Sequence, residues 1–314
     1  MTETTSHAGR EIARQPRAWA QACELLPQVA DLLPRPGERV AVLGCGTSWF
    51  MAAAYAALRE AAGAGETDAF AAGQWPAARG YDRVVAISRS GVTTEVLRAV
   101  GATAAPVTAI TSVAGSPVEA EAEAAIVLDF AGEASVVQTV FATTALTLLR
   151  ASLGDSVEAA AVQAARILGG EHGLDPAVEA ASQFTFVGSG WGAGIAAEAA
   201  LKMRESARVW TESYPQLEYR HGPISIAEPG RVVWIFGEPA PGLVDDVVGT
   251  GATIVNDDLD PVADLVRVQR LGVALAGRQG FDPDRPRHLT RSVILSPASP
   301  TSPAGAASPA GAAP

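Results

Sequence analysis

Three ionisable side chains stand at helical spacing in the second half of the chain: Glu198, Lys202 and Glu205. Spacings of four and three residues place all three on one face of a helix. Such a set can be a simple surface ion pair, but the residues around it, 195–203, are mostly apolar, as in a buried helix. Because a buried charge is costly unless it is paired or functional, the pattern weakens the surface ion-pair interpretation and makes this group a candidate functional site.

Lys202 is also the only lysine in the chain, which has 22 arginines. A coding bias towards arginine explains this equally well as a need for an ammonium at position 202, since a guanidinium cannot shift its pKa in the same way. Composition alone leaves both explanations open.

Two hydroxyl-rich turns are candidates for anion binding, at residues 44–48 and 88–93. Each follows an expected strand and opens an expected helix, where free backbone N–H groups attract a phosphate. The first turn is not a dinucleotide fingerprint, because Trp49 stands where the third glycine is needed. An ordinary capping turn is the alternative for either alone, but the pair at one sheet edge favours a phosphate cradle, with these hydroxyl residues: Thr47, Ser48, Ser88, Ser90 and Thr93. Arg89 either adds a charge to this cradle or points to solvent.

Short apolar runs alternate with helical stretches along the chain, which predicts an α/β fold. We expect strands at 40–43, 84–88, 107–111, 126–130, 184–188, 232–237 and 252–255, and helices at 11–33, 48–62, 93–100, 136–153, 195–208 and 261–276. The plan occurs twice, so two tandem domains are expected, each a parallel sheet flanked by helices. We place a helical segment at 1–34, the domains at 35–155 and 156–295, and a disordered tail of Ser, Pro, Ala, Gly and Thr at 296–314.

Composition excludes several classes of protein. The net charge of −11, without a basic cluster, argues against nucleic-acid binding. No apolar run approaches the roughly 18 residues that a membrane span needs, and the first residues lack the apolar core of a secretion signal. Cys23 and Cys45 lie in different segments, which fits a reducing compartment. We therefore expect a cytoplasmic protein.

His221 lies in a segment that the Gly222-Pro223 pair marks as a loop. A loop histidine beside Glu218 is able to shuttle protons near neutral pH, although a single loop histidine is more often merely exposed.

Taken together, these segments resemble the sugar isomerase (SIS) family in its double-domain form, including the isomerase half of glucosamine-6-phosphate synthase and the amino-sugar-phosphate deaminase/isomerases. The resemblance covers nearly the whole chain up to the tail, in the family's order and spacing. It rests on residues 11–16, 44–48, 88–93, 133–139, 200–205, 212–223 and 284–289.

The resemblance implies roles for individual residues. The hydroxyl residues of the cradle would hold a sugar phosphate, and Gln138 would line the same pocket. Glu205 would move a proton between C1 and C2 through an enediol or enolamine, and Lys202 would stabilise that intermediate. His221 would assist ring opening from a neighbouring subunit, so a homodimer is implied. No metal or organic cofactor is required.

Four departures from the family limit what is carried over. Arg291 replaces a lysine that forms an imine with the open sugar, and a guanidinium cannot do this. Arg89 replaces a typical glutamine and Val140 a typical lysine. The chain also begins at the isomerase region, without a glutaminase domain.

We therefore expect an isomerase or deaminase of a 6-phosphorylated amino sugar or fructosamine, with Arg291 near its substrate. The alternative is a non-catalytic phosphosugar sensor or regulatory protein.

Overall fold

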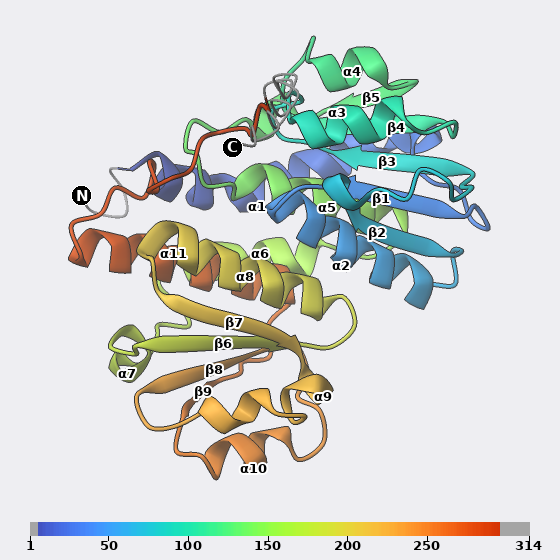
Figure 1. Cartoon of the computed structure of the whole chain (residues 1–314). Helices are drawn as coiled ribbons and strands as arrows, with labels where there is room; N and C mark the ends of the chain where they lie inside the picture. The colour runs from blue at the N-terminus through green and yellow to red at the C-terminus, as the bar shows by residue number, and fades with distance from the viewer. Residues whose placement is uncertain (1–5, 296–314) are drawn as a thin grey trace, which may run out of the picture.

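Two parallel sheets lie on either side of a central layer of helices in the computed structural model of the chain, which describes residues 6–295 (Figure 1). The first sheet has the order β2-β1-β3-β4-β5 and the second β7-β6-β8-β9. Their strands are β1 (Val40–Gly44), β2 (Thr67–Ala71), β3 (Arg83–Ile87), β4 (Val107–Thr111), β5 (Ala124–Val127), β6 (Gln183–Gly188), β7 (Trp210–Pro215), β8 (Arg231–Phe236) and β9 (Thr253–Val255). All neighbouring strands pair in parallel, as the alternating pattern predicted.

Helices follow the strands and cover both faces of each sheet. They are α1 (His7–Val29), α2 (Thr47–Ala61), α3 (Thr94–Gly101), α4 (Pro117–Glu121), α5 (Val140–Ser152), α6 (Glu158–Leu168), α7 (Pro176–Glu179), α8 (Gly192–Ala207), α9 (Gln216–Tyr219), α10 (Leu243–Val248) and α11 (Pro261–Arg278). None of those in residues 6–295 combines the length and apolar character that a bilayer span requires.

The alternation of side chains along each strand decides where the cores lie. In β1, Val40 and Val42 face the central helices, whereas Ala41 and Leu43 face α3 and α4. In β8, Val232 and Trp234 face the centre, while Val233 and Ile235 pack under α9 and α10 on the outer face. The largest core is therefore the layer between the sheets, where residues from both halves of the chain pack together.

The two sheets share one topology. In each, the first strand of the half is flanked by the second and third, so β1 corresponds to β6 and β3 to β8. Glycines occupy the same places at the ends of β1 and β6. Gly44 and Gly188 are the last residues of these strands, and two residues later Gly46 and Gly190 both have φ of 54°. The repeated architecture is thus visible in two sheets, and the division into two domains at residue 155 stays a proposal.

Some predicted boundaries were wrong. The expected strand at 126–130 is β5 at Ala124–Val127, followed by a 3₁₀ turn, and α5 begins at Val140 instead of residue 136. Strands β2 and β7 were not predicted at all. The expected disordered tail, 296–314, lies outside the described residues.

Candidate functional site

The first turn of the predicted cradle brings the start of α2 very close to the end of β1. A side chain at Gly44 would place its Cβ 2.4 Å from the backbone carbonyl carbon of Ser48, so only glycine fits there. Gly46 adopts φ of 54°, a conformation that favours glycine. Thr47 and Ser48 are consequently buried in the first turn of α2, where the N–H groups of Ser48 and Trp49 donate to the Cys45 and Gly46 carbonyls at 3.1 and 3.0 Å.

The second turn follows β3, the neighbour of β1. Gly91 has φ of 66°, and a Cβ there would lie 2.3 Å from Ser116 Oγ. The turn leads to Thr93, which precedes α3 but makes no capping hydrogen bond with its side chain. Both turns therefore present hydroxyl groups at the carboxyl edge of one sheet, as predicted.

Apart from Thr47, which does not reach it, these hydroxyl side chains line one small polar pocket, together with residues from distant segments: Cys45, Ser48, Ser88, Arg89, Ser90, Thr93, Gln138 and Arg291. Two of its polar atoms, Ser88 Oγ and Gln138 Oε1, are buried without a hydrogen-bond partner. Because buried polar atoms are nearly always paired in native proteins, this pocket has unused capacity for a polar ligand. Burial raises the pKa of the Cys45 thiol to about 11, so it enters the pocket uncharged.

Arg89 does not point to solvent, so that alternative is wrong. Arg89 is only 3% exposed. The guanidinium donates to the carbonyls of Ser135 and Val136 at 3.1 Å each, and to that of Arg291 at 2.9 Å. It also lies 3.5 Å from Glu133. Burial lowers the pKa of Arg89, and the nearby charge of Arg291 acts in the same direction. Arg89 therefore ties the wall of the pocket to the C-terminal segment.

Glu133 is a functional candidate that the sequence analysis did not single out. It is buried, and it accepts hydrogen bonds from the backbone N–H of Thr139 at 2.6 Å and from its hydroxyl at 3.1 Å. Burial raises its pKa, while Arg89 acts in the opposite direction. These bonds hold residues 133–139 as a loop instead of the expected start of α5, and the loop delivers Gln138 to the pocket. An acidic residue between apolar neighbours was the available signal.

The ammonium–carboxylate group on α8 is buried, as its apolar surroundings predicted. Lys202 and Glu198 are each 1% exposed, and Lys202 Nζ lies 3.5 Å from Glu198 Oε1. Lys202 also forms an ion pair with Glu205, whose side chain is 18% exposed. Burial by itself would lower the pKa of Lys202, but the two carboxylates outweigh it and raise this pKa. Burial raises the pKa of Glu198 to about 8. Lys202 and Glu205 form the closer of the two ion pairs on this helix.

This group lies against the first turn of the cradle. The Thr47 side chain interacts with Glu198. A side chain built at Gly46 would approach Leu201, the neighbour of Lys202, to 3.8 Å. The helices α2 and α8 cross closely, because a Cβ at Gly194 would lie 2.8 Å from the carbonyl oxygen of Phe50. The structure thus brings Lys202 to the same side of the molecule as the cradle.

His221 is not brought to these residues within the chain. It is exposed in a turn after α9, where its N–H donates to the Glu218 carbonyl at 3.0 Å. That turn follows β7 at the carboxyl edge of the second sheet, whereas α8 runs back from this edge. Lys202 lies ten residues into α8, about 15 Å along its axis at roughly 1.5 Å per residue.

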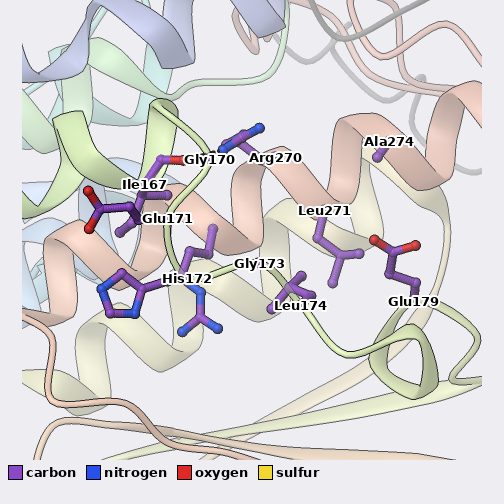
Figure 2. A pocket seen from close by; sticks show the side chains of 11 residues that line it. Ile167, Gly170, Glu171, His172, Gly173, Leu174, Glu179, Arg270, Leu271 and Ala274 are labelled. Atoms are coloured by element: carbon purple, nitrogen blue, oxygen red, sulfur yellow. Dashed lines mark hydrogen bonds between the residues drawn. The ribbon is translucent and has the colours of Figure 1, made fainter.

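A separate cavity of about 590 Å³ lies elsewhere, between residues 170–174 and α11. Figure 2 shows His172 and Leu174 on the loop beside Arg270 and Leu271 on the helix. Its buried Arg267 is neutralised by Asp257 and Asp264, at 2.6 and 3.0 Å. None of the predicted site residues lines this cavity. In residues 6–295, no group of three or more His, Cys, Asp or Glu side chains is placed to share a metal ion.

Comparisons with known proteins can now be set beside this geometry. The glutamine–fructose-6-phosphate aminotransferase (isomerizing) of Aeropyrum pernix is 29% identical over 93% of this chain and 59% of its own length. The enzyme of the same name from Methanothermobacter thermautotrophicus is 27% identical over 91% and 57%. The chain therefore spans little more than half the length of these relatives. No family model matches the chain.

Solved structures share the fold. Glucosamine-6-phosphate deaminase from Thermotoga maritima aligns with a TM-score of 0.77 at 24% identity, over 92% of this chain and 100% of its own. Tagatose-6-phosphate ketose/aldose isomerase from Escherichia coli aligns with a TM-score of 0.76 at 18% identity, over 95% and 98%. The curated relatives support the resemblance to the sugar isomerase family, and the solved structures establish a common fold.

Proposed function

We propose that this chain is a phosphosugar isomerase or deaminase that acts on a 6-phosphorylated amino sugar or fructosamine. The proposal rests on two observations: a pocket of hydroxyl groups with unpartnered buried atoms, and a buried ammonium–carboxylate group whose Glu198 is hydrogen-bonded by Thr47 in the first turn of the cradle. The names of the relatives, which concern fructose 6-phosphate, glucosamine 6-phosphate and tagatose 6-phosphate, point to the same class of substrate.

In this proposal the phosphate is held by the hydroxyl groups of Ser48, Ser88, Ser90 and Thr93, near the positive ends of the α2 and α3 helix dipoles. Gln138 and Arg291 complete the pocket, and Arg291 faces it with a permanent charge. Arg291 also donates to the carbonyl of Glu133, which fixes the C-terminal segment over the loop that carries Gln138.

Proton transfer is assigned to Glu205, which is partly exposed and thus able to meet a substrate. As Glu205 takes a proton from the sugar carbon, negative charge develops on the enediol or enolamine oxygen. The ammonium of Lys202 is already in place and is shielded from water, so it stabilises this charge without reorganisation.

The only lysine is engaged in this ion pair, so an imine between the enzyme and the open sugar is not part of the proposed mechanism. Arg291, at the position of the family's imine-forming lysine, contributes binding instead. We further propose the two domains at 35–155 and 156–295, and a homodimer in which His221 is supplied across the interface.

The experiment is hydrogen exchange at C1 of fructose 6-phosphate and at C2 of glucosamine 6-phosphate, followed by NMR in deuterated water. We expect exchange with the wild-type protein and a loss of at least about a hundredfold in Glu205→Gln, the usual range for a positioned general base. Binding of the sugar phosphate should persist in the variant, and Glu212→Gln serves as a control for a nearby carboxylate on β7. Exchange at the wild-type rate in Glu205→Gln would refute the assignment.

The same experiment distinguishes the proposed enzyme from the second candidate, a non-catalytic phosphosugar sensor. This candidate is favoured by the distance of His221 from Lys202 within one chain and by Arg291 at the imine position. Tight binding of a phosphosugar without exchange in the wild-type protein would establish the sensor.

A further inference from the structure

A basic groove lies on the outer side of Glu205, beyond the cradle. Two pockets form it, of about 330 and 350 Å³, and both are lined by Arg204 and Arg208. The first extends to Arg287 and His288 in the C-terminal segment, and the second extends to Trp210 at the start of β7. None of the hydroxyl residues of the cradle lines either pocket.

The groove concentrates positive charge that the described residues do not neutralise. Arg204, Arg208 and Arg287 form no ion pair within residues 6–295, in a chain with a net charge of −11. The only acidic residue that lines the groove, Glu205, is already paired with Lys202. Arg204 is held in place by donating to the carbonyl and hydroxyl of Thr211, at 3.2 and 3.0 Å. Such a set of guanidinium groups is suited to an anion.

The backbone places two of these side chains at a conformational cost. Arg208 ends α8 with φ of 56°, where glycine is the usual residue, and His288 has φ of 67°. They are two of the three non-glycine residues with positive φ in the described part of the chain. Because such conformations persist only where the surroundings enforce them, and gather at binding sites, they support a functional role for this groove.

An aromatic surface adjoins the charges. Trp210 is 73% exposed, at the start of the edge strand β7, immediately after α8 (Figure 1). Its exposed indole offers a face for stacking a planar ring. The Arg208 guanidinium is itself fixed over the ring of Phe281, with 3.9 Å from Cζ to the ring centroid. Arg204 and Arg208 therefore line both pockets of the groove, one of which also contains Arg287 and the other the exposed indole of Trp210.

We propose that this groove binds a nucleoside diphosphate, with its phosphates at Arg208 and Arg287 and its base stacked on Trp210. The site is distinct from the phosphosugar pocket and borders Glu205, so its occupancy would influence the reaction. The influence on the reaction rests on the proposed function, whereas the nucleotide site is argued from the residues of the groove alone.

Isothermal titration calorimetry with ADP tests the proposal, with inorganic pyrophosphate as the probe that lacks a base. We expect the wild-type protein to bind ADP more tightly than pyrophosphate, with an affinity that falls as salt rises. Arg208→Ala and Arg287→Ala should weaken both probes. Trp210→Ala should weaken ADP alone, by roughly tenfold or more, and Trp210→Phe should retain most of the affinity. Arg17→Ala, an exposed arginine on α1, is the matched control.

Circular dichroism establishes that each variant is folded before titration. Absence of ADP binding, or binding that Arg208→Ala and Trp210→Ala leave unchanged, would overturn the proposal. So would displacement of ADP by fructose 6-phosphate, since the groove would then belong to the sugar site. Retained ADP binding in a protein without hydrogen exchange at C1 or C2 of these sugar phosphates would leave the groove standing while refuting the proposed function.

Discussion

At the scale of single residues, the phosphate pocket depends on polar atoms that the protein leaves without partners. Ser88 is 4% exposed, and its hydroxyl oxygen has no hydrogen-bond partner in the described structure. An unpaired buried atom of this kind lowers the stability of the free protein. A ligand that forms a hydrogen bond with it regains the lost free energy on binding. Stability and affinity should therefore respond to its removal in opposite ways.

Ser88→Ala is expected to leave the free energy of unfolding unchanged or to raise it by up to about 1 kcal/mol, because it removes an unpaired buried group. The dissociation constant for the phosphosugar should rise by roughly tenfold, the usual loss for a hydrogen bond to a charged group. Urea unfolding and calorimetry measure the two effects. A loss of stability of several kcal/mol would show that Ser88 has a structural partner.

Glu198 gives stability a dependence on pH. Its pKa is raised by burial from the ordinary value of 4.5 to about 8. Between these values the folded protein holds a proton that the unfolded chain has released, so stability falls as pH rises from about 4.5 to 8 and levels off above that. The contribution is fully present below the lower value.

Glu198→Gln should remove this dependence, because glutamine resembles the protonated carboxyl group. The difference in melting temperature, variant minus wild type, should therefore increase from pH 5 to pH 8. This window lies between the ordinary pKa of 4.5 and the raised pKa of about 8. Glu212→Gln, which changes a less buried carboxylate, provides the comparison. A difference between variant and wild type that does not vary with pH would contradict a raised pKa for Glu198.

At the scale of elements, the site is made by the close approach of a helix to the strand before it. The approach occurs twice, at Gly44 before α2 and at Gly188 before α8, where a Cβ would lie 2.4 and 2.2 Å from backbone atoms. Only the first of these turns carries the cradle hydroxyls Thr47 and Ser48. The repeated geometry is therefore structural in both halves, and the proposed anion binding involves the first.

Gly44→Ala and Gly188→Ala should each lower stability by about 1–3 kcal/mol, the range for overpacking. Only Gly44→Ala should also reduce phosphosugar affinity, because it displaces the first turn of α2. Thermal unfolding and calorimetry on the folded variants distinguish the two. Equal losses of affinity would mean that the second turn also contributes to binding.

At the scale of the whole molecule, one layer of helices is shared by both sheets and carries the acid–base group. Trp19 of α1 donates to Thr143 of α5 at 3.0 Å, and Gln15 of α1 donates to Gln269 of α11 at 2.7 Å, which joins the two halves through buried contacts. His221 lies outside this layer and is exposed. The proposed catalytic residues Lys202 and Glu205 therefore lie together within one chain, and His221 does not lie with them.

Mixing Glu205→Gln with His221→Ala should restore activity if His221 acts across a dimer interface. Random pairing of subunits gives roughly a quarter of the sites both intact residues, so recovery should approach a quarter of the wild-type activity. The separate variants, each inactive, are the controls. Failure to recover activity after demonstrated subunit exchange would place His221 outside the reaction.

The periodic parts of the fold could be predicted from the sequence, and the long-range contacts could not. Buried strands such as β4 and the helices with strong apolar patterns were located within a few residues. The edge strands β2 and β7 were missed, because they are mostly half-buried and contain polar residues such as Asp68 and Glu212.

For the site, residue types and spacing identified the hydroxyl turns and the group on α8. The contact of Arg89 with Glu133 joins residues 44 positions apart, and the backbone N–H of Ala8 meets Asp284 across 276 positions. No local pattern encodes such contacts, so the bonding of Arg89 and the loop at 133–139 had to come from the structure.

The central claim is spatial: a phosphate held by two hydroxyl-rich turns places its sugar beside Lys202 and Glu205. A crystal structure of the complex with fructose 6-phosphate tests it most directly. The account predicts the phosphate among Ser48, Ser88, Ser90 and Thr93, with C1 or C2 within reach of the Glu205 carboxylate. A phosphate bound elsewhere, or a sugar carbon turned away from Glu205, would contradict it.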